Sequence, residues 1–463
     1  MNSRPGLRWI ADACGPQRSR PSVRSRYDET NVVDAYALDP TQPDVVGVPR
    51  YHPATGKVVA DERDDGLPMR PEARFVGDLR PHQRAVVDAF RTRNHGVVVL
   101  GCGRGKTATA IYLATELFRR RTLYVVHREP LFDQVRRELA RFAPEARVGT
   151  IRQNRVDAGD DKDVVVAMLQ SLCMHEYDAS AYRGYGVVVV DEAHHICSTV
   201  FSRLLPMLAA RVRIGLTATP ERPDGLTPLL RWHVGDDVRV DDSAPTEPSP
   251  QQQRLAVMFR LDYDGTKLGD EPARAPPKSH AAKMAQRSVL LKRMTAFAAR
   301  ERFVAKSLRA LYDDRSRGRN VVAFTHQVDH VHRMHRSLCR RRPSAAKDSA
   351  AYVGALKREA RDAAAQKRVL VATYQMASEG FDQPRLDTLF LATPARSDVT
   401  QILGRIEREH PGKAPLLVYD LWDDLGPFAR GGWARRRTYE ARGFAVAIEP
   451  VRLAALALSA PQS

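Results

Sequence analysis

One short segment, residues 187–192, constrains the fold of this chain more than any other feature. Four consecutive valines are followed directly by Asp191 and Glu192. An unbroken run of β-branched residues is typical of a strand that is buried on both faces of a parallel sheet. Because an ionised carboxylate is costly to bury without a cation, we expect Asp191 and Glu192 to lie at the carboxyl edge of such a sheet, next to a bound cation.

A glycine-rich loop upstream completes this expectation. Residues 101–107, Gly-Cys-Gly-Arg-Gly-Lys-Thr, follow an apolar strand-like run and open a helix-like one. Glycines let the backbone turn its N–H groups inward, and the positive end of the helix dipole faces the loop, so this arrangement cradles phosphates. Lys106 would reach the β- and γ-phosphates, and the Thr107 hydroxyl would ligate Mg²⁺ together with Asp191. The two segments predict a site for a nucleoside triphosphate and Mg²⁺, although Leu100 stands where the strict loop pattern has glycine.

The charge balance points to a polyanionic partner. The 463-residue chain carries a formal net charge of +18. Such an excess of positive charge favours binding to nucleic acid, and a merely solubilising surface is the alternative. Five scattered cysteines without a CxxC pair indicate a reducing compartment and argue against a structural zinc site.

No segment of the sequence predicts association with a membrane. No secretory hydrophobic region opens the chain, and the late apolar run 453–458 is too short to span a bilayer. We therefore expect an intracellular protein, in the cytoplasm or the nucleus, without a membrane partner. The oligomeric state does not follow from the sequence.

The order of apolar runs predicts an α/β fold. Continuous apolar strands alternate with amphipathic helices in two series, so we expect two tandem domains that are each built on a parallel, doubly wound sheet. The predicted parts are a basic, loosely structured N-terminal extension (1–75), a first domain (76–235), a linker or insert with one strand-like run (236–282), a second domain (283–422) and a basic C-terminal extension (423–463).

Seven short motifs, in the order in which they occur, resemble those of superfamily 2 helicases. They are Leu79–Gln83 upstream of the loop, Gly103–Thr107 as motif I, Asp191–His194 as motif II in its DEAH form, Thr217–Thr219 as motif III, Phe324–His326 as motif IV, Thr373–Asp382 as motif V and Gln401–Arg408 as motif VI. The resemblance implies two RecA-like domains with an ATP cleft between them, and an ATPase that works on nucleic acid.

The resemblance also implies roles for individual residues. Glu192 would orient or deprotonate the attacking water. Arg405 and Arg408, with Gln401, would complete the catalytic site from the second domain as arginine fingers. The residues implied in ATP binding are Gln83, Gly101, Gly103, Arg104, Gly105, Lys106, Thr107, Gly380 and Asp382. Those implied in coupling are His194, Thr217 and Thr219, and those implied in nucleic-acid contact, mostly through phosphates, are Arg128, Gln170, Ser171, His326 and Thr373.

Three further segments narrow the resemblance. Residues 126–131, 168–172 and 217–226 are similar to those of helicases from large nucleocytoplasmic DNA viruses, which are relatives of the XPB repair helicase and of the poxvirus transcript-release helicase. This branch implies DNA rather than RNA as the track, and partners in replication, repair or transcription. For a viral protein it also implies location in the host cell or the virion.

Several alternatives share these features. The chain is either a helicase that separates strands or a motor that moves on duplex DNA without separating them, and an RNA helicase fits the same motifs. A passive nucleic-acid-binding factor with an inactive ATPase is a further alternative, against which Lys106, Glu192 and Arg408 argue. A basic and aromatic cluster, residues 433–439, is either a nucleic-acid contact or a solvated helix face. The histidines lack the spacing of metal ligands and are expected on the surface or between domains, namely His195, His330, His332 and His335.

Overall fold

The structure, a computed structural model, divides into two compact units, Met1–Ala244 and Pro245–Ser463. It describes residues 7–11, 22–25, 32–38, 45–53, 57–101, 103–198, 204–222, 224–240, 253–264, 266, 268, 280–314, 318–378, 383–395, 399–408 and 410–458.

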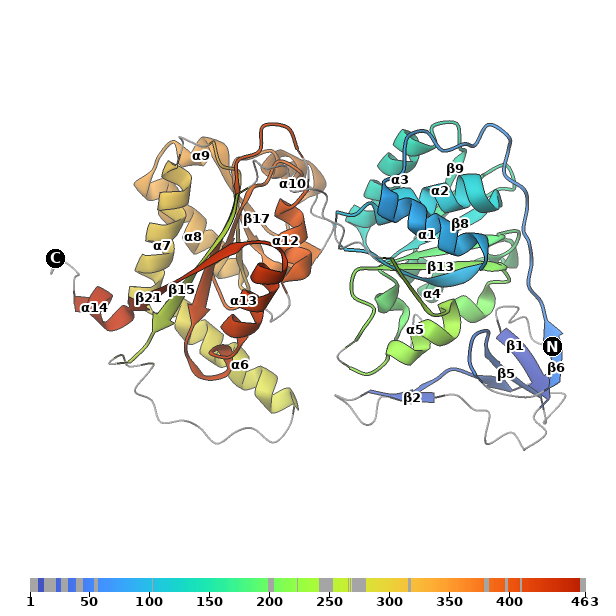
Figure 1. The fold of residues 1–463 in the computed structure, drawn as a ribbon, viewed down its shortest axis with the longest axis horizontal. Helices are drawn as coiled ribbons and strands as arrows, with labels where there is room; N and C mark the ends of the chain where they lie inside the picture. The colour runs from blue at the N-terminus through green and yellow to red at the C-terminus, as the bar shows by residue number, and fades with distance from the viewer. Residues whose placement is uncertain are drawn as a thin grey trace. The chain divides into compact units, whose positions relative to one another are not determined.

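The first unit is built on an eight-stranded sheet with the order β10-β9-β11-β8-β12-β13-β7-β14 (Figure 1). Neighbouring strands are parallel, except for β10 and β9. The strands are β7 (His95–Val99), β8 (Thr122–Val126), β9 (Val148–Arg152), β10 (Arg155–Asp157), β11 (Val164–Met168), β12 (Val187–Asp191), β13 (Val212–Thr217) and β14 (Asp237–Arg239). Every residue of β8, β11 and β12 is buried, so the central strands are covered on both faces.

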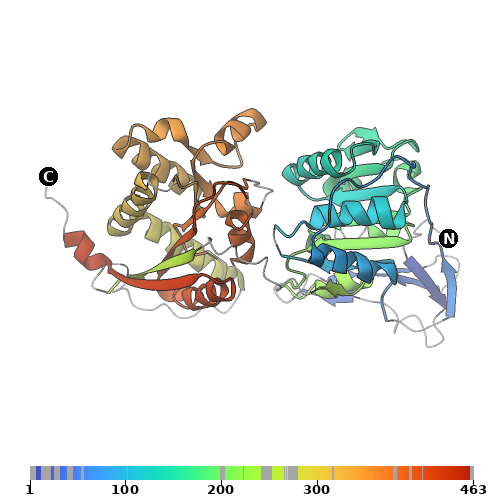
Figure 2. The same cartoon turned by 45° about the horizontal axis from the view of Figure 1, so that its top comes forward.

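Helices on both faces supply this cover (Figures 1 and 2). On one face lie α1 (Pro81–Arg91), α2 (Lys106–Tyr112) and α3 (Glu129–Phe142), and on the other lie α4 (Leu169–Met174) and α5 (Thr227–Val234). Because β7 and β12 are parallel strands on either side of β13, the loop after β7 and the carboxylates after β12 reach the same edge of the sheet.

The N-terminal region is more ordered than the loosely structured extension that we expected for residues 1–75. A four-stranded antiparallel sheet has the order β4-β5-β1-β6 and is formed by β1 (Leu7–Ala11), β4 (Ala37–Leu38), β5 (Val45–Pro49) and β6 (Lys57–Asp61). Short strands β2 (Ser22–Arg24) and β3 (Val32–Asp34) pair with each other. The region is tied to the first domain, because Arg50 donates to the carbonyl of Ala209 at 2.9 Å and Arg70 pairs with Asp163 at 2.9 Å. These strands were not expected from the sequence because their apolar runs are short and are separated by proline-rich segments.

The second unit holds a seven-stranded, wholly parallel sheet with the order β17-β18-β16-β19-β20-β15-β21. Its strands are β15 (Arg254–Asp262), β16 (Val321–Thr325), β17 (Ser349–Tyr352), β18 (Val369–Thr373), β19 (Thr388–Leu391), β20 (Leu416–Asp423) and β21 (Ala445–Arg452). One face is covered by α7 (Ala298–Asp313), α8 (Val328–Arg341), α9 (Ala345–Asp348) and α14 (Leu453–Leu458), and the other by α10 (Arg358–Ala365), α11 (Tyr374–Ser378), α12 (Thr400–Ile406) and α13 (Gly431–Ala441). Helix α6 (His280–Ala296) packs through Leu291 and Met294 on Phe428.

Two expected boundaries are corrected by this sheet. The expected linker, 236–282, contains β15, which lies between β20 and β21 with Ala256, Met258 and Leu261 fully buried. The expected C-terminal extension, 423–463, contains α13 and the edge strand β21. β15 pairs with β20 and β21, which lie far from it in the sequence. The local sequence of a strand does not show which distant strands it pairs with, and this explains both errors.

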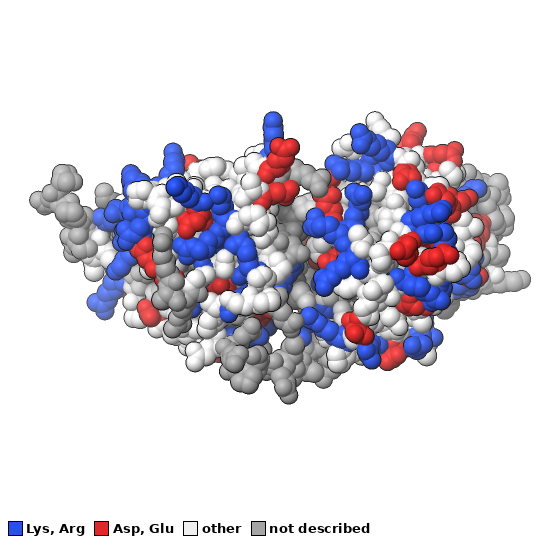
Figure 3. All heavy atoms as spheres, turned by 90° about the horizontal axis from the view of Figure 1, so that it is seen from above, with Lys and Arg blue, Asp and Glu red and all other residues white. Residues whose placement is uncertain are grey.

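The predicted α/β class with two parallel-dominated sheets is confirmed. Lys and Arg side chains gather on the face of the second unit that is seen in Figure 3, in line with the positive net charge. Within the described part of the chain, no helix is both long enough and apolar enough to cross a bilayer.

Candidate nucleotide site and nucleic-acid contacts

The loop between β7 and α2 has the backbone that its glycines predict. Gly103 and Gly105 have φ angles of 76° and 77°, in the left-handed region. A Cβ atom on Gly105 would lie 2.3 Å from Gln83 Nε2, so a larger residue would displace the Gln83 amide and would also be strained at this φ angle. Gln83 Nε2 donates to the Gly105 carbonyl at 3.1 Å, and its Oε1 accepts from Arg80 N at 2.8 Å. Gln83, predicted to bind nucleotide, therefore also holds the loop in place.

Two further contacts fix the loop. His82 Nε2 lies 3.0 Å from the Arg104 carbonyl. Lys106 Nζ donates to the carbonyls of Leu100 and Gly101 at 3.3 and 3.5 Å, so its ammonium group lies at the inner side of the loop. Leu100 is 1% exposed and packs in the core, and its N–H bonds to the Thr217 carbonyl at 3.2 Å. The replacement of glycine by Leu100 thus leaves the loop anchored to the sheet.

A tyrosine that the sequence analysis did not single out joins the loop to the strand of valines. Tyr124, in β8, donates its hydroxyl hydrogen to Asp191 Oδ2 at 3.3 Å and shares a second side-chain hydrogen bond with Thr107. Burial raises the pKa of Tyr124 well above 10, so the hydroxyl keeps its proton. A tyrosine in a fully buried strand needs a polar partner, and this was the available signal.

The electrostatics of Asp191 suit a cation neighbour. Burial, followed by the Glu192 carboxylate, raises the pKa of Asp191 from 3.8 to about 6, whereas Lys106 opposes the rise. Its Oδ1 accepts from the Glu192 N–H at 2.9 Å. Charge on Asp191 is therefore disfavoured in the protein alone, and a bound cation would relieve this cost.

Glu192 is held in a strained backbone conformation. Its φ and ψ angles are 48° and 53°, in the left-handed region, which costs on the order of 1 kcal/mol or more for a residue with a Cβ atom. The carboxylate Oε2 lies 3.5 Å from His194 Nδ1. The bend turns the chain immediately after Asp191.

The three predicted coupling residues lie together. His194 Nδ1 is 3.0 Å from Thr217 Oγ1, and the same hydroxyl oxygen accepts from the Thr219 N–H at 3.1 Å. Burial, with Arg222 as the next cause, lowers the pKa of His194 to about 4. The imidazole is therefore neutral near pH 7 and joins the end of β12 to the end of β13.

A stack of histidine rings extends from this point to the end of β8. The rings of His194 and His195 have centroids 4.3 Å apart, and those of His195 and His127 are 3.9 Å apart and nearly parallel. Burial lowers the pKa of His195 to about 4 and that of His127 to about 2, so uncharged rings stack. The sequence analysis expected His195 on the surface or between domains, and it missed His127.

The predicted strand contacts of the first unit surround this stack. Arg128 Nε donates to His127 Nε2 at 3.0 Å, and Gln170 Nε2 donates to the His127 carbonyl at 2.5 Å. Ser171 is 5% exposed, and its hydroxyl accepts from the Gln153 N–H at 2.9 Å. Gln170 and Ser171 thus hold neighbouring loops, and their contact with nucleic acid stays a prediction.

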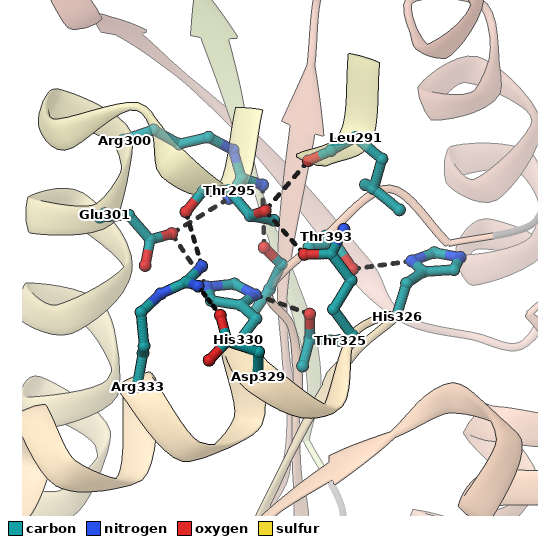
Figure 4. A network of polar contacts seen from close by, with 12 residues as sticks. Leu291, Thr295, Arg300, Glu301, Thr325, His326, Asp329, His330, Arg333 and Thr393 are labelled. Atoms are coloured by element: carbon teal, nitrogen blue, oxygen red, sulfur yellow. Dashed lines mark hydrogen bonds and ion pairs between the residues drawn. The ribbon is translucent and has the colours of Figure 1, made fainter. Parts of the chain in front are cut away.

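In the second unit, two predicted strand contacts lie at one sheet edge. His326 follows β16 and Thr373 ends β18, and these two strands are paired neighbours. His326 Nδ1 is 2.9 Å from Thr393 Oγ1 (Figure 4). The backbone carbonyl of Thr393 accepts a hydrogen bond from the Tyr374 hydroxyl at 2.6 Å. The expected position of His330 on the surface or between domains is wrong, since it is fully buried and bonds Thr325 Oγ1 at 2.7 Å.

Motif VI lies on α12 and the residues after it. Gln401 and Arg405 belong to α12, and Arg408 follows its end. Lys413 Nζ donates to the Arg408 carbonyl at 2.6 Å and fixes this segment. Glu407, at the end of α12, pairs with Arg254 and Arg442 at 3.3 and 2.8 Å. Gly380 and Asp382 lie outside the described residues.

The C-terminal cluster is partly structural. Arg435 and Tyr439 are buried, and both bond Asp420, at 2.7 and 2.8 Å. Arg435 and Tyr439 are therefore neither available for stacking on nucleic acid nor part of a solvated helix face, and contact of the other residues of the cluster with nucleic acid stays a prediction. Trp433 remains 46% exposed.

The phosphate-binding loop, the acidic pair and two parallel-dominated sheets are the features expected of an ATP-dependent helicase. Residues 77–222 match the family described as "Type III restriction enzyme, res subunit". The solved structure of Mss116p bound to single-stranded RNA and AMP-PNP has a similar fold, with a TM-score of 0.54 and 14% identity over 83% of this chain and 81% of that one.

Viral proteins are among the relatives by sequence. The "Putative ATP-dependent RNA helicase L396" of Acanthamoeba polyphaga mimivirus is 27% identical over 85% of this chain and 74% of its own length. The "Putative helicase 055L" of Frog virus 3 is 29% identical over 79% and 78%. The chain is an ATP-dependent helicase of the superfamily 2 type, and its relatives come from large nucleocytoplasmic DNA viruses.

Proposed function

We propose that this helicase uses ATP hydrolysis to move along DNA, which it contacts mainly through phosphates, and to separate its strands in replication, repair or transcription. The observation that carries the proposal is the contact between His194 and Thr217. It ties the acidic pair to the strand end that leads to Thr219, so a change at the nucleotide can be transmitted through the sheet edge. For a viral protein, the site of action would be the infected host cell or the virion.

The chemistry follows from the residues at the sheet edge. Thr107 and Asp191, joined through Tyr124, would hold Mg²⁺, which would neutralise phosphate charge when bound. Lys106 would bind the β- and γ-phosphates, with the loop residues Gly101, Gly103, Arg104 and Gly105 around them. Glu192 would accept a proton from the attacking water or orient it. Gln83, Gly380 and Asp382 would complete nucleotide binding.

Motif VI would supply the remaining positive charge. Phosphoryl transfer depends on positioning and on neutralising the charge of the transferred group. The guanidinium groups of Arg405 and Arg408, with Gln401, would act on the phosphates when the two units close. Loss of phosphate after hydrolysis would remove the charge that holds these guanidinium groups, and the units would open again. Repeated closing and opening would move the predicted strand contacts along the nucleic acid, namely Arg128, Gln170, Ser171, His326 and Thr373.

An RNA helicase is the second candidate function. Two relatives are described as RNA helicases: the mimivirus protein, and a protein of African swine fever virus that is 23% identical over 75% of this chain. These descriptions favour RNA as the substrate. Hydrolysis of ATP in the presence of single-stranded DNA, duplex DNA and RNA, measured in parallel, tests the proposal. If only RNA stimulates ATP hydrolysis, the protein moves on RNA and the proposal of DNA as the track is wrong. Stimulation by duplex DNA without release of a labelled strand would indicate translocation without unwinding.

A further inference from the structure

A groove between α7 and α8 of the second unit is not used by the ATPase mechanism. Its volume is about 530 Å³. Val304, Ala305 and Met334 form an apolar floor, and α8 contributes a row of arginines, Arg333, Arg336 and Arg340. These arginines are three and four residues apart, so they lie on one face of the helix and span about 10 Å along its axis.

The opposite wall of the groove is basic as well. Arg302 and Arg309 lie three residues before and four residues after Ala305, and therefore share its face of α7. Lys306 is exposed beside them. Among the residues that the structure describes, two arginines that line the groove, Arg336 and Arg340, have no carboxylate partner. Three cations of α7 beside the groove also have none: Arg302, Lys306 and Arg309. Other arginines nearby are paired, as Arg342 is with Asp313 at 2.7 Å.

The acid that lines the groove, Glu301, also contacts groups beneath it. Glu301 Oε1 lies 2.9 Å from His330 Nε2 and 3.9 Å from Arg300 Nη1, so its carboxylate is engaged by the buried network beneath the groove (Figure 4). Arg333 pairs with Asp329 and donates to the Thr295 carbonyl at 2.9 Å. Arg336 and Arg340 are thus left to act on an external anion.

One wall of the groove, helix α8, follows motif IV directly in the chain. Helix α8 begins at Val328, directly after His326 and Gln327. Arg333 lies near this end, and Arg336 and Arg340 lie progressively farther from it. A nucleic-acid strand that contacts His326 would therefore meet the row of arginines if it continued along α8.

We propose that the groove between α7 and α8 binds the phosphate backbone of a nucleic-acid strand that leads away from motif IV. This inference rests on the proposed function. Nucleic acid is the occupant favoured by charge, because the cations form rows along both walls, and about 10 Å is the length over which one strand presents roughly three phosphates. Contacts to the phosphate backbone carry no sequence information, so we expect this binding to be independent of sequence and weakened by salt.

The experiment compares two double variants of the full-length protein that lose the same charge. Arg336→Glu with Arg340→Glu reverses two groove cations. Arg137→Glu with Arg155→Glu is the control, because these exposed arginines of the first unit, in α3 and β10, also lack a carboxylate partner among the described residues. Binding is measured by fluorescence anisotropy with single-stranded DNA and RNA of about 10 and about 40 nucleotides, the shorter strand being close to the size of one binding site.

We expect the groove variant to lose about tenfold or more in affinity for the longer strand. The slope of the logarithm of the binding constant against the logarithm of salt concentration should become shallower by roughly 0.7 for each lost phosphate contact. Affinity for the shorter strand and ATP hydrolysis without nucleic acid should stay close to those of the wild type. Equal losses in the groove and control variants, or unchanged binding of the longer strand, would overturn the inference; the second result would point to an acidic protein instead. Failure of the wild type to bind any strand would refute the proposed function itself.

Discussion

The imidazole rings of His127 and His195 stack with their centroids 3.9 Å apart. His127 accepts a hydrogen bond from Arg128, a predicted strand contact. The ring of His195 also lies against that of His194, at a tilt of 38°, and His194 bonds Thr217. A continuous set of contacts therefore joins the predicted strand-binding loop to the acidic pair. A strand phosphate that draws Arg128 away from His127 would disturb the stack.

Replacing His195 by alanine should reduce stimulation of the ATPase by nucleic acid about fivefold or more, the size of a typical coupling effect. Hydrolysis without nucleic acid should change little, because the ring contacts of His195 in the described part of the chain are with His127 and His194. His195→Phe keeps an aromatic ring and should restore most of the stimulation. Rates are measured with and without strand. Equal stimulation in the alanine variant and the wild type would show that the stack does not transmit binding.

Replacing Lys106 by alanine should lower ATP turnover on the order of 10²–10³-fold, since a charge aimed at the phosphates is lost. Strand binding, measured by anisotropy, should be largely retained. Lys162→Ala is the control, because Lys162 pairs with Asp157 away from the loop. Turnover at the wild-type rate would refute the assignment of the phosphate-binding loop.

Replacing Glu192 by glutamine should lower the rate of hydrolysis about 10²–10⁴-fold while ATP still binds, because the amide no longer accepts the proton of water. Single-turnover hydrolysis and equilibrium binding of labelled ATP separate the two effects. The exposed Glu176 provides a matched Glu→Gln control. Normal steady-state rates in the Glu192 variant would exclude this residue as the base.

Replacing Arg408 by alanine should lower the strand-stimulated ATPase on the order of 10³-fold, as expected for a lost arginine finger. Affinity for ATP should change much less, because a finger acts mainly on the charge of the transition state. Arg437→Ala serves as the control. A loss confined to ATP affinity would assign Arg408 to binding instead of catalysis.

The stability of the first unit should decrease as the pH falls from about 6.5 towards 4. His194, His195 and His233 have an ordinary pKa of 6.5, and burial lowers their folded-state pKa values to about 4, 4 and 3. The unfolded chain therefore takes up protons first, which favours unfolding. Asp191, with a pKa raised to about 6, acts in the opposite direction but is a single group.

Chemical denaturation between pH 4 and 8, followed by tryptophan fluorescence, measures this effect. His195→Phe removes one of the titrating groups and should make the dependence on pH shallower. A free energy of unfolding that stays constant or rises between pH 6.5 and 4 would contradict the lowered pKa values.

The sequence by itself determined the two α/β sheets and the chemical groups of the nucleotide site. A run of branched apolar residues such as Val187–Val190 usually forms a strand that is buried on both faces of a sheet. The order of strands, loop and helix along the chain then places Lys106 and Asp191 at one edge of that sheet. Local pattern is sufficient there because backbone geometry and apolar burial act over a few neighbouring residues.

Only the tertiary structure decided the contacts between distant segments. It brought Tyr124 to Thr107 and Asp191, stacked His127 on His195, placed β15 between β20 and β21, and buried Arg435 against Asp420. In each case the partners are far apart in the chain or their pairing depends on packing. Hydrogen bonds, ring stacking and strand pairing at such positions are set by three-dimensional proximity, which periodicity and composition do not encode.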